Sequence, residues 1–142
     1  VCLLHKQGDP QNMQQLPLYH DVVAEVREFL QARIAAALAA GIARERIVID
    51  PGFGFGKNLE HNVALLRQLP AFQDLGAPLL VGLSRKSMLG KIANLEVQDR
   101  VHTSVAAAVL AALRGAKIIR VHDVKATRDA LTIVNAVEGW HE

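Results

Sequence analysis

Short apolar runs alternate along the chain with longer stretches in which apolar and polar positions recur at helical spacing. The apolar runs are rich in Val, Ile and Leu and cover residues 1–5, 46–50, 78–82 and 117–122. Nearly unbroken runs of this kind are typical of strands that are buried on both faces. The helical patterns cover residues 18–40, 58–69, 99–114 and 124–137. This alternation predicts βαβ units, and therefore a parallel sheet with right-handed crossovers.

Local signals mark the ends of several predicted helices. Asn58 is a suitable N-cap for the second helix, and we expect Pro70 to stop that helix. Gly41 and Gly115 follow the first and third helices, which is where glycine commonly terminates a helix. Ser87 begins a further, short helical pattern.

Polar side chains gather at one end of the predicted strands. The first run ends at His5 and the second at Asp50, while the third leads into Ser-Arg-Lys-Ser at 84–87 and the fourth into Arg-Val-His-Asp at 120–123. The connections from each helix to the next strand are small and apolar by contrast. Because parallel strands present their carboxyl ends at one edge, we expect a single functional face, as in barrels and doubly wound sheets.

Length, charge and cysteine content narrow the classes of protein. A chain of 142 residues fits one ordinary domain, and a net charge of +2 offers no basic surface of the kind that nucleic acid requires. The longest stretch without Asp, Glu, Lys or Arg is 101–113, shorter than the about 20 residues that a membrane helix needs. The single cysteine excludes an internal disulfide and favours a reducing compartment. We therefore expect a cytoplasmic protein that binds neither nucleic acid nor a membrane.

The most distinctive stretch is Asp-Pro-Gly-Phe-Gly-Phe-Gly-Lys at 50–57, where a strand ends in a carboxylate and a glycine-rich loop follows. A phosphate-binding P-loop does not fit, because Pro51 stands at its first glycine and Asn58 follows the lysine. A dinucleotide-binding fingerprint fails as well, since Lys57 stands at its third glycine. The glycines are expected to allow close approach of a flat ligand or a sharp bend; a simple left-handed turn is the alternative.

Four segments together resemble the dihydropteroate synthase family, the target of sulfonamides in folate synthesis. They are residues 3–8, 50–57, 81–87 and 120–124. The resemblance covers essentially the whole chain but only the C-terminal half of the family's protein. It implies an α/β fold of the (β/α)8 TIM-barrel type, in which residues 1–142 supply the last four βα units. The chain has no initiator Met and opens like a strand entered midway, so we expect it to begin inside a larger protein.

The resemblance also implies an activity and assigns roles to single residues. The family joins p-aminobenzoate to 6-hydroxymethyl-7,8-dihydropterin pyrophosphate and releases pyrophosphate. Asp50 resembles the carboxylate that accepts two hydrogen bonds from the pterin edge, and a turn cap is its alternative role. Lys86 resembles the lysine between the two substrate sites, with a surface charge as the alternative. Phe55 resembles the ring beside p-aminobenzoate, unless it is a core aromatic. Leu4 matches a residue that lines the pterin pocket, and Gly82 gives ligand access to the backbone.

Arg120 and His122 alternate across Val121, so both point to one face of a strand. A guanidinium beside an imidazole suits a polyanion, and the resemblance assigns this pair to the departing pyrophosphate. A structural ion pair between Arg120 and Asp123 is the alternative. The catalytic set implied by the resemblance is therefore Lys86, Arg120 and His122.

Ser87 begins a helical pattern, and free backbone N–H groups at a helix start attract anions. The resemblance assigns the matching serine and helix end to the carboxylate of p-aminobenzoate. Ser84 and Arg85 flank this position and are expected to contribute to the same binding region. The histidines show no metal-ligand spacing, so we expect no metal ligand within the chain.

Several expectations concern what lies outside these residues. The resemblance implies Mg2+, with its main protein ligand outside this chain, and a homodimer. An eight-stranded barrel does not close with four strands, so we expect the chain alone to have little or no synthase activity and to associate. A pterin-binding methyltransferase domain that uses methyltetrahydrofolate and a non-catalytic half-barrel that binds a ligand or a partner are the two alternatives.

Overall fold

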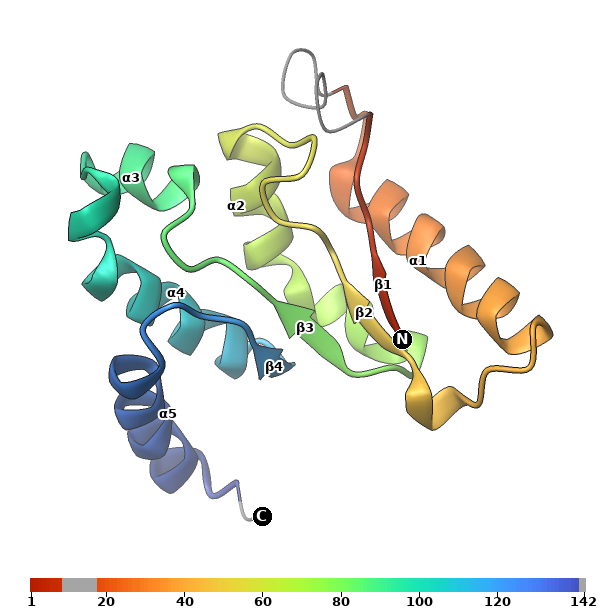
Figure 1. The fold of residues 1–142 in the computed structure, drawn as a ribbon. Coiled ribbons are helices and arrows are strands. Elements are labelled where there is room, and N and C mark those ends of the chain that lie inside the picture. The colour runs from red at the N-terminus through yellow and green to blue at the C-terminus, as the bar shows by residue number, and fades with distance from the viewer. Residues whose placement is uncertain (9–17, 141–142) are drawn as a thin grey trace.

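A computed structural model describes residues 1–8 and 18–140 (Figure 1). In chain order the elements are β1 (Cys2–Leu4), α1 (Val22–Ala39), the 3-10 helix η1 (Arg44–Arg46), β2 (Val48–Asp50), α2 (Leu59–Arg67), the 3-10 helix η2 (Leu69–Leu75), β3 (Leu79–Val81), α3 (Ser87–Ala93), the 3-10 helix η3 (Val97–Asp99), α4 (Val101–Leu113), β4 (Ala116–Ile119) and α5 (Val124–Glu138). The strands form one parallel sheet in the order β1-β2-β3-β4. The predicted α/β fold with a parallel sheet is confirmed.

The hydrophobic core lies between one face of the sheet and the helices. Ile49 and Val81 point to this face and are fully buried at 0% exposure, as are Leu30 of α1 and Leu65 of α2. Ile49 stands beside Leu79 in the sheet, so apolar side chains from neighbouring strands form a continuous layer under the helices.

The opposite face of the sheet, which we call the open face, carries Leu4, Asp50, Leu80 and Ile118 in adjacent register positions. Leu4 pairs with Asp50 and Leu80 pairs with Ile118, and side chains directly opposite in a sheet share a face. Leu4 is 36% exposed and Ile118 is 40% exposed. The prediction that the strands are buried on both faces is therefore wrong for β1 and β4, because described helices cover only one face.

The helix ends differ from the predicted ones where side chains cap them. α1 begins at Val22 rather than at residue 18, because the Asp21 side chain accepts the N–H groups of Val23 and Ala24 at 3.0 Å each. Asn58 caps α2 as predicted and forms a capping box with His61.

The second helix ends before Pro70, as predicted: α2 stops at Arg67, and Pro70 is the second residue of the 3-10 helix η2, where its missing N–H costs nothing. The helix predicted at 99–114 is α4, which begins two residues later because Asp99 is the last residue of η3, while α5 matches its prediction to within one residue. Within residues 1–8 and 18–140, no helix combines the length and the apolar character that crossing a bilayer requires.

Candidate active site

The C-terminal ends of β2, β3 and β4 bring a carboxylate and two cations together. Asp50 is the last residue of β2, Lys86 immediately precedes α3, and Arg120 immediately follows β4. The two cations act electrostatically on the carboxylate, which places all three groups at one edge of the sheet. This convergence is what the strand-end pattern predicted.

The carboxylate of Asp50 is buried and held by the loop that follows it. Its Oδ1 accepts the N–H of Gly52 at 2.8 Å. Burial raises the pKa of Asp50, because the charged form loses its hydration. The Gly52 N–H and three neighbouring cations act in the opposite direction; the cations are Lys86, Lys57 and Arg120. Asp50 is therefore a buried acid whose charge depends on positive partners.

Beside this edge lies a cavity of about 200 Å³. It is lined by Gly82, Ser84, Lys86, Arg120, Val121 and His122. Ser84 fixes one side of it, since its Oγ accepts the backbone N–H of His122 at 3.1 Å and lies 2.9 Å from the ring Nδ1 of that histidine. Two cations and an imidazole around a small cavity form a suitable binding place for an anion.

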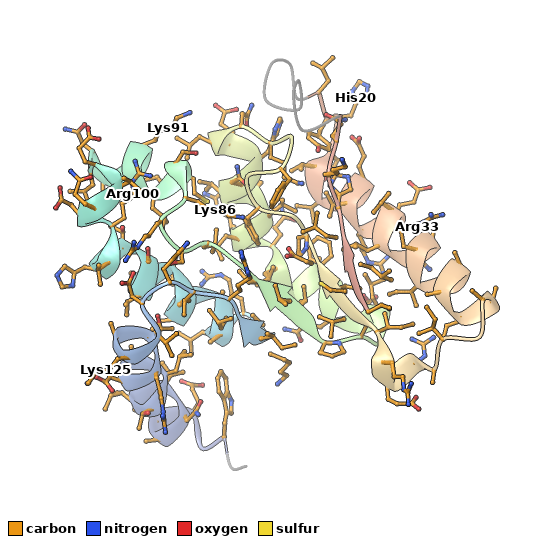
Figure 2. All side chains as sticks on the ribbon, in the orientation of Figure 1. His20, Arg33, Lys86, Lys91, Arg100 and Lys125 are labelled. Carbon is orange, nitrogen blue, oxygen red and sulfur yellow. The ribbon has the colours of Figure 1, made fainter. Side chains whose placement is uncertain are left out.

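Lys86 reaches from the β3–α3 connection toward the loop after β2 (Figure 2). Its Nζ donates to the carbonyl of Phe53 and lies 4.8 Å from the centre of the Phe55 ring, which is a cation–π geometry. Burial lowers the pKa of Lys86, Asp50 acts to raise it and Arg120 to lower it further. The ammonium group of Lys86 is thus held by the Phe53 carbonyl and the Phe55 ring on a half-buried side chain, so Lys86 is not a freely solvated surface charge.

In the glycine-rich loop, residues 51–57, two positions require glycine because neighbouring backbone lies too close to admit a side chain. Gly52 and Gly56 have left-handed φ angles of 73° and 64°. A Cβ on Gly52 would stand 1.8 Å from the carbonyl oxygen of His5, and one on Gly56 would stand 2.3 Å from that of Gln7. The left-handed alternative is therefore confirmed, and the space at these two glycines is filled by the segment after β1 rather than by a flat ligand.

The guanidinium of Arg85 forms an ion pair that was not predicted from the sequence. Its guanidinium binds the carboxylate of Asp123 through two hydrogen bonds, of 2.7 and 3.1 Å. The alternative pairing of Arg120 with Asp123 is wrong, because Asp123 takes Arg85 instead. Arg85 has a φ of 58°, and its backbone is fixed by Ser104 Oγ and by the Arg100 guanidinium. It does not line the cavity of Arg120, so its contact with a substrate stays a prediction.

The remaining candidates lie around the same edge but not in one cavity. Leu4 lies beside Asp50 on the open face. Ser87 is the exposed first residue of α3 and borders a separate hollow of about 380 Å³, which also reaches Lys57 and Lys91. Lys86, one position earlier in the chain, lines the cavity that holds Arg120. Of the predicted residues, one cavity is lined by Gly82, Ser84, Lys86, Arg120 and His122 and a separate hollow by Ser87, whereas neither is lined by Leu4, Asp50, Phe55 or Arg85.

Three buried polar residues at this site received no role from sequence. Lys57, the last residue of the glycine-rich loop, and His5 and Asn62, which lie outside it, are all buried and form hydrogen bonds that hold the loop. Lys57 stands at the end of the glycine run, which is a local signal, but its partner His5 lies 52 positions away. Their pairing follows from the packing of β1 beside β2.

Comparison with known proteins places this geometry in a family. Residues 1–122 match the family model described as pterin binding enzyme. The dihydropteroate synthase of Escherichia coli K12 is 53% identical over 136 residues, which are 96% of this chain and 48% of that protein. The enzyme of the same name from Neisseria meningitidis serogroup C is 57% identical over 133 residues, or 92% of this chain and 47% of that protein. The chain thus spans about half the length of these relatives.

Solved structures agree with the sequence relatives. The Yersinia pestis dihydropteroate synthase in complex with a sulfonamide drug matches 99% of this chain and 51% of its own, with a TM-score of 0.95 and 51% identity. The Xanthomonas albilineans enzyme with 4-aminobenzoic acid matches 96% of this chain and 48% of its own, with a TM-score of 0.89 and 52% identity. These relatives carry the name of the synthase, so a methyltransferase is not favoured. The chain belongs to the pterin-binding enzyme family, and its relatives within that family are dihydropteroate synthases.

Proposed function

We propose that this chain supplies the catalytic C-terminal half of a dihydropteroate synthase. The enzyme would join p-aminobenzoate to 6-hydroxymethyl-7,8-dihydropterin pyrophosphate. In this reaction the amine nitrogen bonds to the pterin methylene carbon while the bond from that carbon to the pyrophosphate oxygen breaks, and the nitrogen then loses one proton to solvent. The observation that carries the proposal is the convergence of Asp50, Lys86 and Arg120 at the C-terminal ends of β2, β3 and β4.

The open face supports a half-barrel, in which residues 1–142 contribute the last four βα units of eight. Barrels of this type place the active site at the C-terminal ends of their strands, where the polar side chains gather in this chain. In the part of the chain that the structure describes, β1 and β4 each pair with one neighbour only. The exposed apolar side chains of Leu4 and Ile118 would become interior if further strands closed the sheet.

Asp50 would hold the pterin. A carboxylate accepts two parallel hydrogen bonds from an edge that presents two N–H groups, as the pterin edge does. The carboxylate is buried and is oriented by the Gly52 N–H, so it is fixed before the ligand arrives. Leu4 lies beside it and would cover one face of the ring system, while Gly82 leaves the backbone accessible.

Arg120 and His122 would bind the pyrophosphate. Both line the cavity of about 200 Å³, and Ser84 orients the histidine ring. As the bond to the methylene carbon breaks, pyrophosphate leaves with the bonding electron pair, and its oxygen gains negative charge. A guanidinium placed at that oxygen stabilises this charge in the transition state.

Lys86, Phe55 and Ser87 would position p-aminobenzoate. Lys86 contacts the ring of Phe55 and acts electrostatically on the carboxylate of Asp50, so we place it at the border of both substrate positions. Ser87 follows directly and would receive the carboxylate of p-aminobenzoate in the second hollow. Arg85 would act indirectly, because its pair with Asp123 holds the connection that carries Lys86.

Mg2+ would be bound at the site mainly by residues from outside this chain. Among residues 1–8 and 18–140, no group of three His, Cys, Asp or Glu side chains is placed to hold a metal ion. The homodimer and the cytoplasmic location stay predictions.

A chimeric enzyme tests the activity. In it, this chain replaces the matching stretch of the Escherichia coli synthase, to which it is 53% identical. We expect the chimera to form dihydropteroate, and Asp50→Asn and Lys86→Met each to lower kcat/KM by about 100-fold or more. Lys125→Met, at an exposed lysine on α5 that lines neither hollow of the site, is the matched control and should retain activity.

The chain alone gives the contrasting measurement. We expect it to turn over little or no substrate and to associate at micromolar concentration. An inactive chimera that folds would contradict the proposal, and so would a chimera whose activity survives both Asp50→Asn and Lys86→Met. If methyltetrahydrofolate binds tightly while pyrophosphate does not affect pterin binding, the methyltransferase alternative is correct. If no small molecule binds, the chain is a non-catalytic module.

A further inference from the structure

Lys57 is a buried cation that the proposed reaction does not use. Its side chain is 3% exposed. A buried ammonium is stable only where hydrogen-bond acceptors replace its hydration. Its Nζ donates to the carbonyls of Gly52 at 2.8 Å and Phe55 at 3.0 Å, and lies 3.4 Å from the carbonyl of His5 and 3.0 Å from that residue's ring Nδ1.

These partners belong to two separate segments of the chain. Gly52 and Phe55 are in the glycine-rich loop after β2, while His5 directly follows β1. The missing Cβ at Gly52 and Gly56 lets the two segments come into backbone contact. Lys57 fills the space between them, so a single ammonium group joins the end of β1 to the loop after β2.

The loop that Lys57 holds is the one on which Lys86 rests. The carbonyl of Phe53 accepts a hydrogen bond from Lys86, and the Phe55 ring lies under its Nζ. Phe53 lies between the two carbonyls that Lys57 binds, and Phe55 supplies one of them. A shift of the loop would therefore move both contacts of Lys86.

The charged and titratable groups that face Lys57 come from several elements. They are His5 after β1, Asp50 of β2, Lys86 before α3 and His61 of α2. Burial lowers the pKa of Lys57 to about 7, with Lys86 lowering it and Asp50 raising it. The pKa of His5 is lowered to about 4, so at neutral pH its ring is uncharged and can accept a hydrogen bond.

We propose that Lys57 is a positioning residue, which clamps the glycine-rich loop to the end of β1 and thereby sets the place of Lys86 at the edge of the anion cavity. Its catalytic consequence rests on the proposed function, whereas the clamp itself is a property of the folded chain. Two measurements separate these claims.

Amide hydrogen exchange in this chain tests the clamp. The N–H of Phe55 donates to Gly52 within the loop, and the N–H of Ile49 donates to Pro78 within the sheet. In Lys57→Met we expect protection of the Phe55 amide to fall about tenfold or more while that of Ile49 is retained. Lys57→Gln keeps two N–H donors without the charge and should lose less. Lys125→Met, the exposed control on α5, should leave both amides unchanged.

Kinetics of the chimera test the consequence for Lys86. We expect Lys57→Met to lower kcat about tenfold or more, with a much smaller change in the KM for the pterin pyrophosphate, because a misplaced lysine affects the reacting geometry. If the unmutated chimera is inactive, the proposed function is contradicted. The hydrogen-exchange result then decides by itself whether Lys57 clamps the loop to the end of β1. Equal loss of protection at Phe55 and Ile49, unchanged Phe55 protection, or failure of both Lys57 variants to fold would overturn the positioning role.

Discussion

Gly52→Ala should destabilise this chain more than any effect of backbone conformation explains. Gly52 has a φ of 73°, and Gly41, after α1, has a similar φ of 87°. Around Gly41 nothing lies within 4 Å of the position of an added Cβ. At Gly52 the added Cβ would stand 1.8 Å from the carbonyl oxygen of His5. Both substitutions place an alanine in a left-handed backbone conformation, but only Gly52→Ala also brings the new Cβ into a clash with the carbonyl of His5.

The magnitudes follow from this difference. A left-handed conformation costs an alanine roughly 1–2 kcal/mol relative to glycine, which is the whole effect expected for Gly41→Ala. The clash at Gly52 is with backbone, which cannot rotate away, so β1 must separate from the loop after β2. Overpacking of this kind adds about 1–3 kcal/mol, and Gly52→Ala should cost about 2–5 kcal/mol in total.

Urea unfolding followed by far-ultraviolet circular dichroism measures both free energies. Gly54→Ala is a further control, because its φ is 78° but its Cβ would stand 3.4 Å from the flexible Lys86 side chain. We expect its cost to resemble that of Gly41→Ala. If Gly52→Ala costs no more than Gly41→Ala, the end of β1 does not pack against the glycine-rich loop, and the reasoning is refuted.

Two further changes test the local and electrostatic parts of the structure. Asn58→Ala removes the cap of α2 and should lower the free energy of unfolding by about 1 kcal/mol, whereas Glu60→Ala, an exposed residue of the same turn, should cost less. The pKa of Lys57 is about 7 in the native chain against an ordinary value of 10.5, so between these pH values the unfolded chain binds more protons and the free energy of unfolding rises with pH. The slope contributed by Lys57 is at most about 1.4 kcal/mol per pH unit and should disappear in Lys57→Met but not in Lys91→Met. Urea titrations at several pH values measure it, and a slope that persists in Lys57→Met contradicts the assignment.

Much of the fold could be predicted because it depends on local pattern. The apolar runs and helical periodicities specify the alternation of strands and helices, and Asn58 marks the start of α2. The start of α1 was misplaced because the periodic pattern extends beyond the true cap, Asp21. The exposed face of β1 and β4 was missed because the sequence does not show whether another element covers the face on which an apolar residue lies.

Part of the candidate site could also be predicted from local sequence pattern, and part of it could not. Asp50, Lys86 and Arg120 could be brought together from sequence because parallel strands end at one edge. The pair of Arg85 and Asp123 could not, since 38 positions separate the two residues. Sequence reasoning instead considered Arg120 as the partner of Asp123, which is close in the chain. The clamp at Lys57 was hidden for the same reason, because its partner lies beyond α1 and β2.

The central claim is that the strand ends form one pocket for a pterin and its departing anion. Calorimetric titration of the chimera with 6-hydroxymethylpterin, with and without pyrophosphate, measures it most directly. We predict that pyrophosphate strengthens pterin binding by about tenfold, that Arg120→Met removes this coupling, and that Arg128→Met, on the exposed surface of α5, leaves it intact. Pterin binding that is indifferent to pyrophosphate, or coupling that survives Arg120→Met, would contradict the account.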